Sequence, residues 1–233
     1  MTSDAIKRQI FRYQESAGIQ DVEDLLVNEE EFAIYVNDRF YGQYTCSPSY
    51  WEEMVVGKLA LEGTISTYED IISMDNIDNQ LHVKTNGRLS ARTSALVEEP
   101  VISALDVIQL MKKHLESSEL HRFTGGVHLM GLGKGNSLLA VREDISRHTA
   151  VEKIYGYCLI NNVECRDKIF LSSGRVTKDL IAKILEMQVR IIVSRAAVSS
   201  RAQEMAQEQG ITLIGFARGE RFNIYSHPHR IIV

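Results

Sequence analysis

The second half of the chain alternates between short apolar runs and longer segments in which apolar residues recur every three to four positions. Short apolar runs are typical of buried strands, and the longer spacing is typical of amphipathic helices. Strands separated by helices predict βαβ units and a sheet covered on both faces. From residue 100 we expect helix 100–118, a strand pair within 125–144, helix 146–160, strand 168–174, helix 176–188, strand 190–196, helix 199–210, strand 211–217 and strand 221–226.

The first half has a different pattern. Residues 31–46 alternate apolar and polar side chains around Asn37 and Asp38, which predicts a β-hairpin. A helix is expected next, with Ser47 as the N-cap, Pro48 as the first helical residue and Gly63 just past the end.

The remaining N-terminal segments complete a small unit. Residues 81–85 read as a strand, and residues 1–18 read as a polar amphipathic helix. We therefore expect a small α+β domain over residues 1–95, followed by an α/β domain over residues 96–233.

Composition and charge restrict the possible functions. A chain of 233 residues fits one large domain or one domain with a smaller appendage. The net charge of −5 gives no basic footprint for nucleic acid, and no apolar run is long enough to cross a bilayer. Residues 1–18 lack the apolar core of a signal peptide, so a cytoplasmic location is expected.

Three cysteines are present, and their odd number argues against a disulfide framework. Cys158 lies in an apolar context that predicts a buried thiol. Cys165 lies among charged residues and is expected in an exposed loop, and Cys46 follows the second strand of the predicted hairpin.

Arginines follow three successive strands of the second half. If these strands are parallel, their carboxyl ends share one edge of the sheet, where ligands of open α/β sheets bind. Two helices are expected to begin at the same edge, and helix N-termini attract anions. Guanidinium groups match phosphate oxygens in pairs, so a phosphate-bearing ligand is one interpretation and solvated surface arginines are the other. The residues concerned are Arg175, Arg195, Arg218 and Arg221, with the helix starts near Thr177 and Ser199.

Two histidines are further candidates for ligand contact. His128 follows Gly125 and Gly126 at a strand start and is expected to be a packed structural residue, with ligand contact as the alternative. His148 could act as an acid or base, because imidazole titrates near neutrality. In the same motif, Asp144 or Ser146 could cap the following helix. A zinc deaminase would need H-x-E followed by P-C-x-x-C, which the sequence lacks, so no metal site is expected.

Five collinear stretches carry a family resemblance. They are "IYVNDRFYGQYTCSPSYWEEMVVGKLALEGTI", "FTGGVHLMGL", "EDISRHTAVEKIYG", "FLSSGRVTKDLIAKI" and "GITLIGFARGERFNIYSHPHRI". In this order they resemble motifs of the FdhD family of formate dehydrogenase accessory sulfurtransferases, over most of the chain from about residue 30 to the end.

The resemblance implies a fold and a cytoplasmic role. The fold would be a cytidine-deaminase-like three-layer α/β/α domain with a small N-terminal domain, and the protein would be a homodimer. Its role would be to take sulfur as a persulfide from a cysteine desulfurase and pass it to the molybdenum or tungsten bis-molybdopterin guanine dinucleotide cofactor of formate dehydrogenase. GDP would be a mimic of this cargo. The family's cofactor-binding stretch matches Phe216, Ala217, Arg218, Gly219, Glu220 and Arg221.

The sequence also departs from the family. Ser146 and Thr149 replace the glycine and asparagine of the family's "EDxGRHNA" motif. The family carries C-G-x-C-G after a T-S-S step, and here, within "RTSALVEEP" (92–100), the two cysteine positions fall on Leu96 and Glu99. Neither side chain can hold a persulfide, which requires a nucleophilic thiolate. Sulfur transfer is therefore doubtful, and no catalytic residue is assigned.

Three hypotheses remain open from the sequence. The protein could bind the cofactor without transferring sulfur by the usual route. It could transfer sulfur through Cys46 or Cys165, or it could share the fold and bind another nucleotide or phosphate ligand as a regulator.

Overall fold

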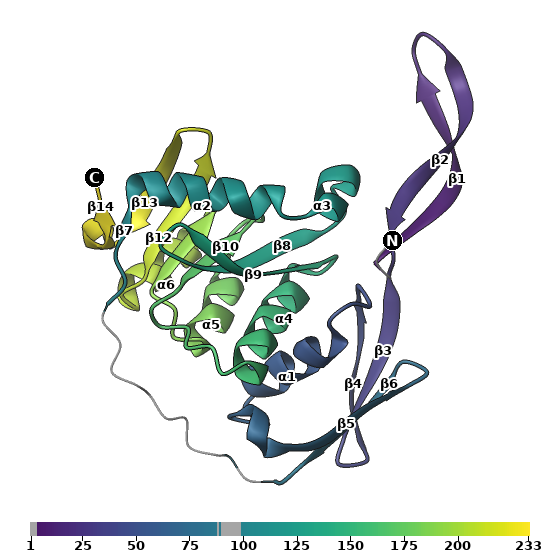
Figure 1. Cartoon of the computed structure of the whole chain (residues 1–233), viewed down its shortest axis with the longest axis horizontal. Coiled ribbons are helices and arrows are strands. Elements are labelled where there is room, and N and C mark those ends of the chain that lie inside the picture. The colour runs from purple at the N-terminus through teal and green to yellow at the C-terminus, as the bar shows by residue number, and fades with distance from the viewer. Residues whose placement is uncertain (1–3, 88, 90–98) are drawn as a thin grey trace.

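The computed structural model describes residues 4–87, 89 and 99–233, and its centre is a six-stranded mixed sheet (Figure 1). The order across the sheet is β13-β12-β11-β10-β8-β9, in which β10, β11 and β12 are parallel and the others antiparallel to their neighbours. The strands are β8 (His128–Lys134), β9 (Ser137–Asp144), β10 (Ile169–Ser172), β11 (Ile191–Ser194), β12 (Thr212–Arg218) and β13 (Arg221–Ser226).

Helices cover both faces of this sheet, as Figure 1 shows. On one face lie α2 (Ala104–Glu116) and α3 (Glu119–Thr124), and on the other lie α4 (Arg147–Ile160), α5 (Lys178–Glu186) and α6 (Ser200–Glu208). Successive residues of a central strand of this sheet point to opposite faces, so they pack alternately into two separate hydrophobic cores. The sequence prediction of an α/β class with three layers is confirmed, together with its alternating strands and helices.

The N-terminal half adds a four-stranded sheet in the order β4-β3-β6-β5. The elements are β3 (Glu30–Val36), β4 (Arg39–Cys46), α1 (Trp51–Leu61), the 3-10 turn η1 (Tyr68–Asp70), β5 (Ile71–Ile77) and β6 (Gln80–Thr85). The predicted hairpin turns at Asn37 and Asp38, both with positive φ, and is confirmed. Gly63 follows the C-cap Glu62 with φ of 72°, as predicted for the helix end.

Helix α1 crosses α4 at very close range. A Cβ atom added to Gly57 would overlap the carbonyl oxygen of Glu152, and one added to Gly156 would overlap that of Glu53. The two glycines therefore let the helix backbones touch. One hydrophobic core runs through this contact, from Phe32 and Leu59 in the first half to core residues of the large sheet. The boundary expected between residues 95 and 96 falls outside the described residues and stays a prediction.

The helix predicted over residues 1–18 is wrong. Residues Ala5–Gln14 form strand β1, which pairs antiparallel with β2 (Gly18–Val27) over its whole length. The resulting two-stranded ribbon projects from the body of the molecule (Figure 1). The turn places Gly18 at φ of 68°, a conformation that glycine adopts without steric cost. We call β1 and β2 together the arm.

Two predicted helix starts are also wrong. Helix α1 begins at Trp51, and the backbone of Ser47 is instead hydrogen-bonded to the side chains of Asp144 and Lys153. Helix α2 begins at Ala104, where the side chain of Ser103 accepts a hydrogen bond from the Asp106 N–H.

The segment just before α2 is extended. Strand β7 (Ile102–Ser103) pairs with β14 (Ile231–Ile232), which follows the 3-10 turn η2 (Pro228–Arg230). None of the helices in the described part of the chain is long and apolar enough to cross a membrane.

Candidate functional site

The carboxyl ends of β10, β11 and β12 form one edge of the large sheet, as the sequence predicted from parallel strands. Arg175 and Arg195 follow the first two strands and are exposed. The antiparallel strands bring the start of β8 and the end of β9 to the same edge, because His128 pairs with Asp144. We call this the carboxyl edge.

Histidines and arginines lie close together at the carboxyl edge. Partial burial lowers the pKa of His128, and the nearby charges of Arg147, His121 and Arg175 lower it further. Partial burial likewise lowers the pKa of His148, with smaller contributions from Lys183 and Arg147. Burial is the main cause of both shifts, although Asp179 opposes the shift at His148. The lowered pKa favours the neutral imidazole, which can accept or donate a hydrogen bond.

His121 extends the same cluster. Burial lowers its pKa, and Arg195 lowers it further. The predicted ligand contacts His128, His148, Arg175 and Arg195 thus come to one edge of the sheet. Arg147 lies with them, and His121 joins them without having been predicted from the sequence.

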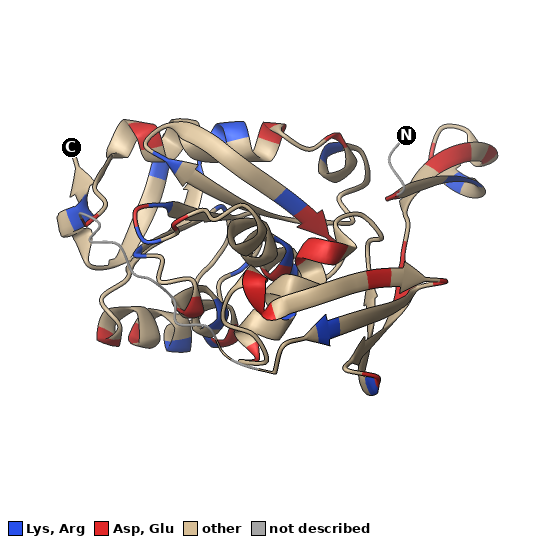
Figure 2. Cartoon of the chain, turned by 60° about the horizontal axis from the view of Figure 1, so that its bottom comes forward, with Lys and Arg blue, Asp and Glu red and all other residues tan. Residues whose placement is uncertain are grey.

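Basic and acidic residues are interspersed over the rest of the molecule (Figure 2). With a net charge of −5 for the whole chain, the concentration of cations at the carboxyl edge is a local feature.

Three helices point their N-termini at this edge. Ser146 caps α4 by accepting from the Thr149 N–H, and Ser199 caps α6 by accepting from the Ala202 N–H. Helix α5 follows Thr177, which makes no side-chain capping bond. Within the described chain, Nδ1 of His148 and Oγ1 of Thr177 are buried polar atoms with no hydrogen-bond partner. Unsatisfied donors and acceptors beside helix N-termini suit an anionic ligand.

The stretch from Phe216 to Arg221 extends beyond the edge. Phe216 has φ of 51°, lies at a bulge in the β12–β13 ladder, and donates its N–H to the Ala196 carbonyl. The guanidinium of Arg218 lies 5.4 Å from the Phe216 ring. A bulky residue in the left-handed region is costly and recurs at binding sites. Ala217 is buried, and Arg218, Gly219, Glu220 and Arg221 are exposed at the hairpin tip.

A buried ion pair lies beneath the carboxyl edge, at the end of β9. Nζ of Lys153 lies 2.7 Å from Oδ2 of Asp144, and both side chains are fully buried. Lys153 also donates to the Ser47 carbonyl, while Asp144 accepts from the Ser47 and Ser146 N–H groups. The motif "EDIS" thus has two parts: Ser146 caps the helix, and Asp144 fixes the turn that presents Arg147 and His148.

All three cysteines are buried. Burial raises the pKa of Cys46 to about 12, and the nearby Asp144 carboxylate adds to this. The pKa of Cys158 is also raised, first by a hydrogen bond with Cys165 and then by burial. The prediction of an exposed Cys165 is wrong, because its thiol donates to the Val163 carbonyl inside the core. No described cysteine is placed to work as an accessible thiolate.

The positions at which the sequence resemblance expects cysteines are Leu96 and Glu99. Leu96 lies outside the described residues. The carboxylate of Glu99 is hydrogen-bonded to the guanidinium of the buried Arg230, which holds the pKa of Glu99 below its usual range.

Within the described ranges, no group of three or more His, Cys, Asp and Glu side chains could hold a metal ion.

Residues 87–232 match the model of the FdhD/NarQ family. The chain belongs to the FdhD/NarQ family. It is 33% identical to the sulfur carrier protein FdhD of Bacillus subtilis (strain 168), covering 96% of both chains. It is also 33% identical to the protein of that name from Methanothermobacter thermautotrophicus, covering 98% of this chain and 100% of the relative.

A crystal structure described as that of a candidate formate dehydrogenase accessory protein from Desulfotalea psychrophila superimposes with a TM-score of 0.86. The two sequences are 27% identical, and the match covers 98% of this chain and 99% of the other. Family membership and the shared fold are therefore established over nearly the whole chain.

Proposed function

We propose that this FdhD/NarQ family member is an accessory protein of formate dehydrogenase that binds the guanine dinucleotide form of the molybdenum or tungsten cofactor at its carboxyl edge. The observation that carries the proposal is the convergence of Arg147, Arg175 and Arg195 with the N-termini of three helices. This arrangement supports binding of a diphosphate.

The residues present fit such a group. The unpartnered Nδ1 of His148 and Oγ1 of Thr177 can each bond a phosphate oxygen or a guanine edge. The arginines would neutralise the phosphates, and the hairpin at Arg218 would cover the ligand. When bound, the cofactor would supply the metal centre that formate dehydrogenase needs, and this chain would hold it by its nucleotide end.

Sulfur transfer through a described cysteine is not part of the proposal. A carrier must expose a thiolate to the desulfurase, and Cys46, Cys158 and Cys165 are buried. The relatives are named sulfur carrier proteins, and one solved relative is described as a formate dehydrogenase accessory protein, so formate dehydrogenase is the expected partner. A cysteine desulfurase as a second partner and a homodimer as the assembly are expected from the sequence resemblance alone. Binding without transfer would make this chain a cofactor holder.

A GDP titration by calorimetry tests the proposal. Arg195→Ala should weaken binding by about tenfold or more, because it removes a charge-assisted bond to phosphate. Arg190→Ala is the matched control: Arg190 is also exposed but lies just before the same strand, at the opposite edge of the sheet. No GDP binding, or equal affinity in both variants, would refute the site. A different nucleotide copurifying with the chain would indicate a regulator instead.

A further inference from the structure

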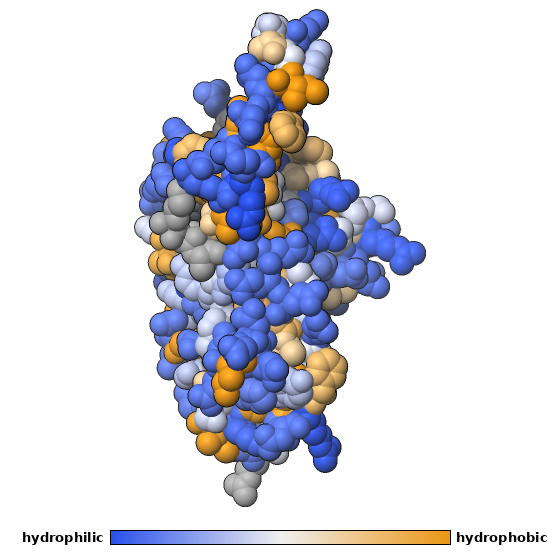
Figure 3. Space-filling view, turned by 90° about the vertical axis from the view of Figure 1, so that its right-hand side faces the viewer, coloured by the Kyte–Doolittle hydropathy of each residue, from blue (hydrophilic) through white to orange (hydrophobic). Residues whose placement is uncertain are grey.

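The arm presents apolar side chains that no other part of the described chain covers. Phe11, Tyr13 and Ile19 are 79%, 71% and 74% exposed. Tyr13 and Ile19 are direct partners in the ladder, and Phe11 lies two residues before Tyr13, so all three project from one face of the ribbon. Figure 3 faces the arm and shows apolar patches at its projecting upper end.

The same face is buried at the base of the arm. Three apolar residues there lie on the same face of the ribbon as the tip residues: Ala5, Leu25 and Val27. They pack against a small core formed by Leu120, Val127 and Leu129. The base is seated closely, since an added Cβ at Gly126 would lie 2.7 Å from Cγ2 of Val27. Beyond the body, this face of the ribbon first carries polar side chains and then ends in the apolar tip; the polar residues are Lys7, Gln9, Asp21 and Glu23.

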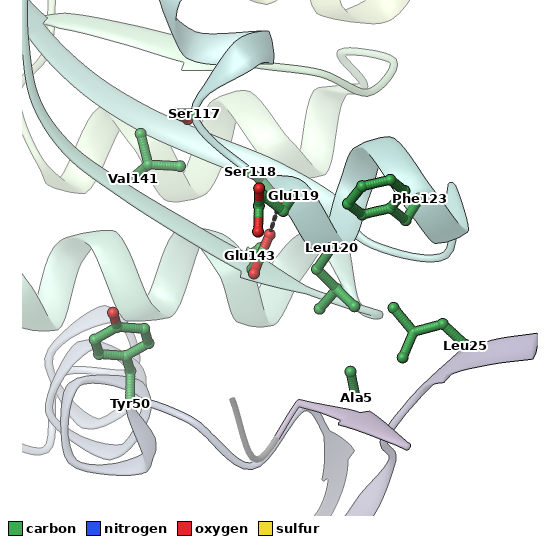
Figure 4. Close-up of a pocket in the computed structure, with 10 residues that line it drawn as sticks. All are labelled: Ala5, Leu25, Tyr50, Ser117, Ser118, Glu119, Leu120, Phe123, Val141 and Glu143. Atoms are coloured by element: carbon green, nitrogen blue, oxygen red, sulfur yellow. Dashed lines mark hydrogen bonds between the residues drawn. The ribbon is translucent and has the colours of Figure 1, made fainter. Parts of the chain in front are cut away.

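A pocket of about 620 Å³ opens between the arm base and the body. Figure 4 shows Leu25, Leu120, Phe123 and Val141 pointing into it, with Tyr50 and Glu143 at its side. The Ser118 hydroxyl is hydrogen-bonded to the Glu143 carboxylate. Phe123 is 65% exposed, so the pocket has an apolar rim that lacks a covering group within the described chain.

We propose that the tip of the arm, at Phe11, Tyr13 and Ile19, packs into this pocket of a second copy of the chain. If two copies were related by a two-fold axis beside the arm bases, each arm tip would fill the pocket of the other copy and would itself be covered. Such a self-complementary contact is typical of an isologous dimer. An unrelated partner would need one apolar group that enters the pocket and a second apolar surface that packs on the arm tip.

The charges of the arm favour a like partner. Lys7 pairs with Glu23, and Arg12 pairs with Asp24, so the apolar tip is flanked by neutralised pairs of both signs. The whole arm has three cations and four carboxylates, so two identical arms meet with only a small like-charge repulsion. An isolated two-stranded ribbon is only marginally stable in water, so docking would also stabilise the arm.

This interface would belong to the homodimer that the proposed function expects, and it rests on that function in part. Association of the chains and binding of GDP are measured separately, so failure of the interface can be distinguished from failure of the cofactor site. Sedimentation of the full chain should show a dimer, and Phe11→Ser with Ile19→Ser should weaken association by about a hundredfold, or tenfold for each buried side chain. Ile72→Ser with Ile77→Ser, two exposed isoleucines of β5, should leave it unchanged. The arm variant should keep the wild-type circular dichroism spectrum and bind GDP normally.

Cross-linking gives an independent readout. Ile19 lies six residues along β2 from Leu25 at the pocket, a span of about 20 Å. This exceeds the reach of a disulfide, so Ile19→Cys with Phe123→Cys in one chain can form only a disulfide between copies when oxidised with copper phenanthroline. Ile72→Cys with Phe123→Cys should not cross-link. A monomeric wild type, unchanged association of the arm variant, or no cross-linked dimer would overturn the proposal.

Discussion

Replacing Lys153 with methionine should destabilise the protein severely. Its ammonium lies 2.7 Å from Asp144 and 2.9 Å from the Ser47 carbonyl, with no solvent exposure. Methionine fills most of the volume but leaves the Asp144 carboxylate buried without a cation. Removing one partner of a buried pair typically costs about 3–5 kcal/mol, and we expect a loss in this range at pH 7.

The loss should also depend on pH. Burial already raises the pKa of Asp144, and removing Lys153 takes away the charge that opposes this rise. A folded-state pKa above the unfolded value of about 3.9 means that the native state binds the extra proton. The Lys153→Met variant should therefore keep its stability relative to the wild type at low pH, and should lose it as the pH rises through the pKa of Asp144 in the folded variant. The difference between variant and wild type should widen between about pH 4 and pH 7.

Urea denaturation at several pH values measures this effect. Lys134→Met is the matched control, because Lys134 and Asp167 are also 2.7 Å apart but Lys134 is 62% exposed. Surface pairs contribute about 1 kcal/mol or less, so this control should remain near the wild type at every pH. If Lys153→Met lost no more stability than Lys134→Met, or if its deficit shrank as pH rose, the account of the buried pair would be wrong.

Three further predictions concern packing and thiols. Gly57→Ala should lower the free energy of unfolding by about 2 kcal/mol or more, measured by thermal or urea unfolding, because the α1–α4 crossing has no room for Cβ. Gly18→Ala has open space around it and should lower the free energy of unfolding by about 1 kcal/mol through its positive φ. Equal losses in the two variants would contradict the close crossing. In the native chain at pH 8 a thiol reagent should label Cys46, Cys158 and Cys165 far more slowly than in urea, and rapid native labelling would show that a thiol is accessible. Leu96→Cys with Glu99→Cys should let the chain gain one sulfur atom from a cysteine desulfurase and cysteine, as measured by intact mass, whereas the corresponding double serine variant should not; a sulfur adduct on the unaltered chain would show that another thiol serves.

The sequence predicted the carboxyl edge well because the features involved are periodic. Buried strands such as Ile191–Ser194 are continuous apolar runs, and parallel strands necessarily share an end, so the convergence of Arg175 and Arg195 followed from pattern alone. His121 was missed because it comes from α3, a six-residue helix with little periodicity, and reaches the edge only through tertiary packing.

The errors have a common physical cause, which is contact between segments far apart in the chain. The spacing of Ile6, Ile10 and Tyr13 suits a helix in isolation, but pairing with Gly18–Val27 makes it a strand. Ser47 has the right chemistry for a cap, but its backbone is held by the distant side chains of Asp144 and Lys153, and the helix begins at Trp51. Cys165 has charged neighbours in sequence and apolar neighbours in space. Local propensity is overridden wherever such contacts are stronger.

The glycine crossing between α1 and α4 has a consequence for how the chain can be divided. With Gly57 and Gly156 in backbone contact and one apolar core on both sides, neither half can bury its own surface alone. A protease cut between β6 and β7 should therefore leave two fragments that remain bound to each other, and separately produced fragments should complement one another to restore the fold.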